Sequence, residues 1–204
     1  EHKLVSAQCV AQPGRIAGQE SAIVAMGKLG SREMAASSDL DLIFIYDFDH
    51  DNPDSDGSRP LQGGQYFARY TQRLISAFTT RTNYGVLYDI DMRLRPSGRA
   101  GPVATRIDSF AEYQDHEAWT WEHMALTRAR VISSSPGFQQ HIEYIIRDVL
   151  TRRRDAITIA NDVLEMRQAI ADEKGATDIW DLKYAAGGTV GIEFLAEYLQ
   201  LVRA

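Results

Sequence analysis

The chain of 204 residues contains 22 Lys and Arg against 28 Asp and Glu, so its formal net charge is −6. This acidic balance argues against nucleic acid as a partner, and no apolar run approaches the roughly 18 residues of a membrane-spanning helix. A single cysteine excludes an internal disulfide and, with 44% hydrophobic and 25% charged residues, favours a globular protein of the cytoplasm.

The first quarter of the chain combines short strands with turns. Residues 1–20 carry little pattern and are expected to form an N-terminal arm. The sequence SAIVAMG (21–27) predicts a strand that ends in the glycine turn GKLGS (27–31). We expect REMAAS (32–37) to form one helical turn or a structured loop. The apolar run LDLIFIYDF (40–48) is typical of a central strand buried on both faces.

The next segment turns from strand to helix. Residues 47–60 are polar and predict a long loop. Residues 63–80 predict an amphipathic helix, because their apolar side chains recur at helical spacing and are expected in the core. This stripe consists of Phe67, Tyr70, Leu74 and Phe78.

Helices dominate the second half of the predicted structure. Residues 85–98 return to strand periodicity, and helices are then expected over 107–128, 137–150 and 155–173. The apolar side chains of 191–204 cover most of a helix circumference. Such a helix expects partners on several sides, which indicates a piece of a longer chain.

This order of elements predicts an α+β fold, because strands interleaved with helices are followed by helices alone. We expect an N-terminal arm over 1–20, a head with a mixed sheet and flanking helices over 21–135, and a helical region over 136–204. The helical region would be the start of a helical bundle that the chain truncates.

Two aspartates stand at the front of the apolar run. On a strand Asp39 and Asp41 share a face, with Cα atoms about 6.6 Å apart. Carboxylates this close repel each other unless a cation lies between them or one is protonated. Oxygen ligands of this kind suit Mg²⁺ or Mn²⁺. The alternative is that Asp39 only caps a turn and Asp41 lies on a solvated edge.

The second polar strand strengthens the hypothesis of a metal site. Its alternation gives one face of Tyr88, Ile90, Met92 and Leu94, and another of Asp89, Asp91, Arg93 and Arg95. Acids that hold a cation beside guanidinium groups that bind phosphate would complement a metal-bound polyphosphate. The alternative is an amphipathic strand with its polar face in water.

The turn GKLGS offers a third component. Gly27 and Gly30 permit close backbone approach, and Ser31 with the following amides could hold a phosphate. The pattern is not a Walker A loop, because the spacing of that motif does not occur here.

Together these pieces resemble the nucleotidyltransferase superfamily, in which a Gly-Ser turn precedes an Asp-x-Asp strand and a later strand adds a third aspartate. Three longer segments, MGKLGSREMAASSDLDLIFIYD, DMRLRPSGRAGPVAT and AWTWEHMALTRARV, are similar to the glutamine synthetase adenylyltransferase family. So is WDLKYAAGGTVGIEFLAEYLQL. The resemblance spans roughly residues 13–202.

The resemblance implies a fold of the nucleotidyltransferase type and a metal-dependent transfer of AMP from ATP to a tyrosine of glutamine synthetase. The implied catalytic and metal-binding residues are Asp39, Asp41 and Asp91. The implied nucleotide- or phosphate-binding residues are Gly30, Ser31, Ser38, Lys28, Arg93 and Arg95. Mg²⁺ is the expected cofactor, with Mn²⁺ as the alternative, and a PII-type signalling protein is the expected regulator of the longer enzyme.

The direction of catalysis stays open at this point. The segments look more like the C-terminal, adenylylating head of the family than the N-terminal head, which removes AMP by phosphorolysis. A domain of another class, which binds nucleotide and regulates without catalysis, is a further alternative. Gly191 departs from the pattern, since an acidic residue is expected there. Glu122, Arg128 and Arg130 are expected either to reach the site or to form structural ion pairs.

Overall fold

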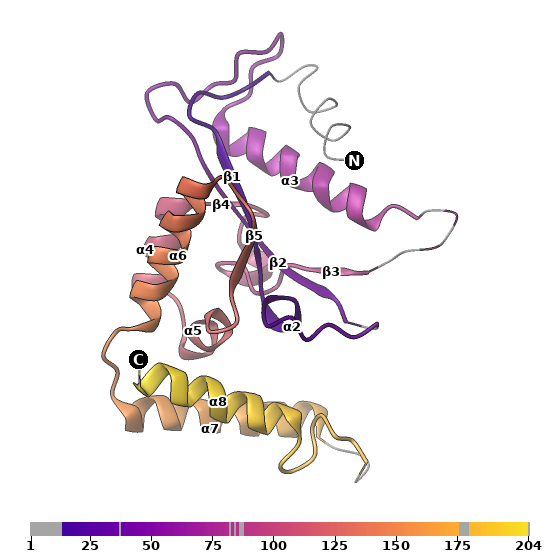
Figure 1. The fold of residues 1–204 in the computed structure, drawn as a ribbon, viewed down its shortest axis with the longest axis vertical. Coiled ribbons are helices and arrows are strands. Elements are labelled where there is room, and N and C mark those ends of the chain that lie inside the picture. The colour runs from indigo at the N-terminus through magenta and orange to yellow at the C-terminus, as the bar shows by residue number, and fades with distance from the viewer. Residues whose placement is uncertain are drawn as a thin grey trace.

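The computed structural model describes residues 14–36, 38–81, 83, 85, 88–175 and 180–203, and within these ranges the sheet has five strands. It is an α+β fold with helices on both faces of a mixed sheet (Figure 1). The strands are β1 (Glu20–Ala25), β2 (Leu40–Asp47), β3 (Ile90–Asp91), β4 (Thr105–Arg106) and β5 (Arg130–Ser133).

Strand β2 lies at the centre of the sheet, as its apolar sequence predicts. The strand order is β3-β2-β1-β5, and β4 also pairs with β2. Strand β1 is antiparallel to both β2 and β5, whereas β3 and β4 are both parallel to β2. Strand β3 pairs with the beginning of β2 and β4 with its end, so each covers only part of that edge.

Helix α3 (Gly63–Thr79) covers one face of the sheet, where Leu42 and Phe44 of β2 pack against Leu74 and Ile75. The predicted helix is confirmed, and Phe67 from its stripe is buried. The expectation that Phe78 lies in the core is wrong, because its side chain is 46% exposed. Phe78 lies one residue before the end of α3, beyond the residues that pack on the sheet.

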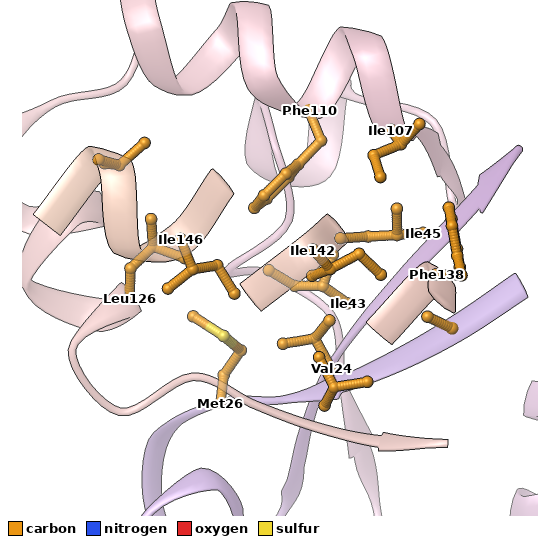
Figure 2. Close-up of a cluster of buried hydrophobic side chains, with 13 residues drawn as sticks. Val24, Met26, Ile43, Ile45, Ile107, Phe110, Leu126, Phe138, Ile142 and Ile146 are labelled. Carbon is orange, nitrogen blue, oxygen red and sulfur yellow. The ribbon is translucent and has the colours of Figure 1, made fainter. Parts of the chain in front are cut away.

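Helices α4 (Ile107–His116) and α6 (Pro136–Leu150) cover the other face, over Ile43 and Ile45 of β2. Figure 2 shows how these side chains interdigitate in the largest cluster of the core. Helix α6 belongs to this core although its residues fall in the expected helical region over 136–204. The boundary at residue 135 stays a prediction.

The helix expected over 107–128 is two helices, α4 and α5 (Thr120–Leu126), and that expectation is corrected here. The Glu122 carboxylate accepts a hydrogen bond from the Trp119 backbone N–H at 2.9 Å, which starts a new helix. The break lets the chain turn from α5 into β5, which pairs with β1. Glu122 also accepts a hydrogen bond from the Tyr113 hydroxyl, so its carboxylate links α4 to the start of α5.

The strand expected over 85–98 is also corrected. Strand β3 ends at Asp91, because the Asp91 carboxylate accepts the Arg93 N–H at 2.8 Å and turns the chain. The alternation predicted beyond Asp91 is therefore wrong, and a short 3-10 helix, Gly98–Ala100, follows. Val86 and Leu87, in the first part of the expected strand, lie outside the described residues.

Helices α7 (Ala156–Lys174) and α8 (Thr189–Arg203) pack against each other and against α5 (Figure 1). Met124, Ile159 and Leu201 form the buried centre of this contact. Other apolar side chains of α8, such as Ile192 and Leu195, are exposed. Over the ranges that the structure describes, no helix is both long and apolar enough to cross a membrane.

Candidate active site

The register of the sheet brings aspartates of two strands together. Asp41 of β2 lies opposite Asp91 of β3, on strands that run parallel at a spacing of about 4.8 Å. Both point to the face of the sheet that Ile43 faces, since side chains alternate along a strand. Asp39 precedes Asp41 by two residues, and the Leu40 N–H donates to the Asp89 carbonyl oxygen at 2.8 Å. The three predicted acids therefore gather at the beginning of β2.

An open pocket of about 340 Å³ lies at this place, along the edge formed by β3 and the turn after it. Its lining combines acids with guanidinium groups. The lining residues are Asp39, Asp89, Ile90, Asp91, Met92, Arg93, Arg95 and Arg99. The sequence shows Arg99 only as part of a basic run, because the turn that brings it back to Asp91 leaves no periodic signal.

The three acids interact electrostatically. Burial raises the pKa of the Asp41 carboxyl, and the charges of Asp91 and Asp39 raise it further. The guanidinium groups of Arg93 and Arg128 oppose this shift. Asp41 is therefore a carboxylate whose ionised form is costly in the structure as it stands, and a nearby cation would favour that form.

Asp91 is held by Arg93. Arg93 donates its backbone N–H to one carboxylate oxygen at 2.8 Å and its Nε to the other at 2.6 Å. Burial acts to raise the pKa of Asp91, but these hydrogen bonds outweigh it and the pKa is lowered. In this arrangement, no three His, Cys, Asp or Glu side chains among the described residues are placed to hold a metal ion. The assignment of metal ligands stays a prediction.

The glycine turn lies directly against Asp41. Its residues Gly27–Gly30 form the one-turn helix α2. The helical turn therefore lies before residues 32–37, where either a helical turn or a structured loop was expected. Gly27 has a φ of 47°, and a Cβ added there would lie 2.4 Å from Asp41 Oδ2. At Gly30 a Cβ would lie 1.9 Å from the carbonyl oxygen of Arg128. Both positions favour glycine because of these contacts within the protein, and an approach of the turn to phosphate stays a prediction.

The predicted phosphate-binding serines make local hydrogen bonds. Ser31 Oγ donates to Glu33 Oε2 at 2.7 Å and accepts from Arg128 Nη2 at 2.9 Å. Ser38 Oγ accepts the Ala35 N–H at 3.0 Å. Lys28 is exposed on α2. The structure thus places Ser31 and Lys28 on the turn beside Asp41, and phosphate binding by these two residues stays a prediction.

Arg95 braces the loop after β3. Its guanidinium donates to the carbonyl oxygens of Met92 at 2.7 Å and Pro102 at 3.0 Å. Because most of its N–H donors already bind backbone carbonyl oxygens, Arg95 contributes positive charge to the pocket rather than a free pair of donors for a phosphate. Arg93, with 62% of its side chain exposed, is better placed to reach a ligand.

Fold and site together define a class of protein: an α+β domain with a mixed sheet, in which aspartates and arginines gather at one end of the central strand. The family model for glutamate-ammonia ligase adenylyltransferase matches residues 3–145. The chain therefore belongs to the glutamate-ammonia ligase adenylyltransferase family, and the resemblance seen in the sequence is confirmed.

Curated relatives match the whole chain. A bifunctional glutamine synthetase adenylyltransferase/adenylyl-removing enzyme of Rhodopseudomonas palustris strain BisB5 is 75% identical over 203 residues, which cover 100% of this chain and 20% of the relative. Proteins of the same name from Bradyrhizobium sp. strain ORS 278 and Xanthobacter autotrophicus strain Py2 are 73% and 60% identical, with 100% of this chain and 21% of each relative covered. The chain thus spans about a fifth of the length of these relatives.

Proposed function

We propose that this chain is a catalytic head that transfers AMP from ATP to a tyrosine hydroxyl of glutamine synthetase. The observation that carries the proposal is the pairing of Asp41 with Asp91 on two neighbouring strands, with Asp39 two residues before Asp41 and a glycine turn beside it. The names of the relatives support adenylyl transfer and glutamine synthetase as the protein substrate. The proposed place of action is the cytoplasm, and a PII-type signalling protein is the proposed regulator of the longer enzyme.

The residues fit a divalent cation in their chemistry. Carboxylate oxygens are the ligands that Mg²⁺ and Mn²⁺ prefer. Burial, together with the charges of Asp91 and Asp39, raises the pKa of Asp41, so a cation beside it would favour its ionised form. Asp39, Asp41 and Asp91 would hold the metal once Arg93 releases Asp91. A bound metal would neutralise charge on the triphosphate and lower the pKa of the attacking hydroxyl.

The protein's further contribution is to position the ATP phosphates and the attacking tyrosine for the reaction. The tyrosine oxygen attacks the α-phosphorus of ATP, the bond from that phosphorus to the β-phosphate oxygen breaks, and pyrophosphate leaves. The Asp91 carboxylate accepts the phenolic proton. Arg93, released from Asp91, and Arg99 at the rim of the pocket bind the phosphate oxygens. The turn with Gly30 and Ser31 holds the outer phosphates.

A second function uses the same site in the other direction. The relatives' names also include adenylyl removal, in which orthophosphate attacks the phosphorus of the tyrosine-bound AMP and releases ADP and the free hydroxyl. A regulatory domain that binds nucleotide without catalysis has less support, because such a domain would not need all three aspartates.

The test uses ATP labelled at the α-phosphate, unmodified glutamine synthetase and Mg²⁺. We expect label on a tyrosine of glutamine synthetase with the unsubstituted chain, and none with Asp39→Asn or Asp41→Asn. Asp51→Asn, an exposed acid of the polar loop, is the matched control and should keep full activity. Release of ADP from modified glutamine synthetase by orthophosphate would assign the reverse reaction instead. Nucleotide binding without either reaction would overturn the proposal in favour of regulation.

A further inference from the structure

Arg128 lies between the glycine turn and helix α8. It follows α5 and precedes β5, and 17% of its side chain is exposed. On one side its Nη2 donates to Ser31 Oγ and to Glu33 Oε2, each at 2.9 Å. On the other side its Nη1 lies 3.3 Å from Glu193 Oε1 and 3.9 Å from Glu197 Oε1. One guanidinium group therefore connects two elements that are far apart in the sequence.

The glycine turn depends on the segment around Arg128 for its position. The backbone of Gly30 packs directly on the carbonyl oxygen of Arg128. Two residues further on, Arg130 donates Nε to the Gly30 carbonyl oxygen at 3.0 Å and Nη2 to the Leu29 carbonyl oxygen at 2.8 Å. Arg130 fixes the backbone of the turn, and Arg128 fixes the side chain of Ser31.

On the α8 side of the contact, two carboxylates compete for the same guanidinium group. Glu193 and Glu197 are one helical turn apart and both face the same guanidinium, which also serves Glu33. Burial raises the pKa of Glu197 to about 7; the charge of Arg128 acts to lower it and that of Glu193 to raise it further. Because one cation is shared among three carboxylates, a change at any of them redistributes the others.

We propose that Arg128 is a positioning residue of the candidate active site, through which helix α8 holds the glycine turn in place. This inference rests on the proposed function, which gives the turn a nucleotide to hold. With both anchors present the guanidinium cannot rotate, and Ser31 stays fixed beside Gly27 and Asp41. When α8 withdraws its acids, the guanidinium gains freedom and the turn loosens. The docking of α8 thereby controls how well the turn is preorganised for phosphate.

The test measures the turn directly, without any reaction. In the structure the Gly30 N–H donates to the Met26 carbonyl oxygen at 2.8 Å and the Ser31 N–H to that of Gly27 at 3.1 Å. We expect Glu193→Gln, a change on α8, to speed hydrogen exchange of these two amides by about fivefold. Glu165→Gln, on the exposed side of α7, is the matched control and should leave both amides unchanged.

A double-mutant cycle shows whether the effect passes through Arg128. Arg128→Lys keeps the charge but cannot bridge two sides at once, so it should speed exchange of the same amides. If α8 acts through Arg128, Glu193→Gln adds nothing in the Arg128→Lys background. Additive effects, or unchanged exchange in Glu193→Gln, would overturn the proposal. Should Arg128→Lys fail to fold, exchange in Glu193→Gln alone decides.

A second readout separates this inference from the proposed function. Glu193→Gln should weaken the affinity for Mg–ATP by about fivefold as well, since the looser turn must be ordered on binding. If the unsubstituted chain binds no Mg–ATP, the proposed function fails while the exchange experiment still decides the role of Arg128. Faster exchange without weaker binding would show that the turn does not hold the nucleotide, and would overturn the inference as stated.

Discussion

Asp41 and Asp91 lie side by side on two adjacent strands, yet the pKa values of their carboxyl groups are shifted in opposite directions. Asp41 is partly buried and lies near the negative charges of Asp91 and Asp39, and both effects raise its pKa. Asp91 is bound by Arg93, which lowers its pKa. The two aspartates are therefore expected to differ in what they contribute to stability, although the proposed chemistry needs both.

We predict that Asp41→Asn raises the free energy of unfolding at pH 7 by about 0.5–1 kcal/mol, after discounting for the water that still reaches the group. The ionised carboxylate costs stability above its folded pKa, so the gain should vanish as the pH falls below about 4. Asp91→Asn should instead lose about 1 kcal/mol at pH 7, because it removes the partner of Arg93. That loss should also fade at low pH, where Asp91 is protonated.

Urea unfolding of the three proteins at pH 7 and at a series of pH values from 5 downward, through the lowered pKa of Asp91, checks these signs. Both variants are expected to lose the proposed transferase activity, so Asp41→Asn would be more stable and less active than the unsubstituted chain. A stability loss for Asp41→Asn at pH 7 would contradict the interpretation that this carboxylate is strained by its neighbours.

Gly27 permits the closest contact with the candidate site. Gly27→Ala combines a left-handed backbone, which costs about 1–2 kcal/mol for an L side chain, with a clash against Asp41 Oδ2. Gly187→Ala is the matched control, because Gly187 has a φ of 79° and nothing lies within 4 Å of an added Cβ. We expect Gly27→Ala to lower the melting temperature more than Gly187→Ala does and to abolish activity. Equal losses of stability would show that Asp41 yields to the methyl group.

At the scale of elements, the sequence predicts some features well for a physical reason. The apolar run of β2 and the i, i+2 pair Asp39 and Asp41 are local patterns, and a strand carries them directly into space. That Asp91 lies opposite Asp41 follows from strand register, which the sequence does not state. The resemblance to a family supplied that partner, and the register is consistent with it.

Other elements could not be predicted because their causes are not periodic. Strand β3 ends at Asp91 because a side chain of the strand itself, Asp91, binds the backbone of the next turn. The split between α4 and α5 depends on one carboxylate, Glu122. Arg128 gains its role only when α8 docks, more than sixty positions later in the chain. All three features depend on polar side-chain contacts, which the spacing of apolar residues in the sequence does not reveal.

Helix α8 carries a glycine where the family resemblance predicts an acid. A Cβ at Gly191 would lie 3.6 Å from Arg167 Nη2 of α7, an ordinary contact distance. We predict that Gly191→Ala stabilises the chain by about 0.5–1 kcal/mol through helix propensity alone. Gly191→Asp should stabilise it further by about 0.3–1 kcal/mol, from the charge of Arg167 and the helix N-terminus.

Thermal unfolding of both variants, alone and combined with Arg167→Gln, measures these contributions. The advantage of Asp over Ala should shrink when Arg167 is neutralised and at high salt. If Gly191→Asp were less stable than Gly191→Ala at low salt, the Arg167 side chain would not face this position in solution.

At the scale of the whole molecule, the α7–α8 pair joins the rest of the fold through an apolar contact and through the ion pairs of Arg128. The apolar contact supplies most of the stability, because the cost of taking the charges out of water offsets much of the attraction in largely buried ion pairs. The ion pairs make the docking of α8 depend on pH, because one of their members, Glu197, has a pKa of about 7. Docking of α8 should therefore respond to pH near neutrality, whereas the apolar core should not.

The final prediction concerns this pH dependence. The pKa of Glu197 is raised above its unfolded value, so the folded state binds more protons between about pH 4.5 and 7 and loses stability as the pH rises through that range. Glu197→Gln lacks this loss, and the charges facing the position, Arg128 and Glu193, are the same in both proteins. The stability of the variant relative to the unsubstituted chain should therefore rise by about 1–2 kcal/mol from pH 5 to pH 8 and then level off. Urea unfolding across this range measures the difference, and a difference that stays constant with pH would mean that Arg128 holds Glu197 ionised throughout.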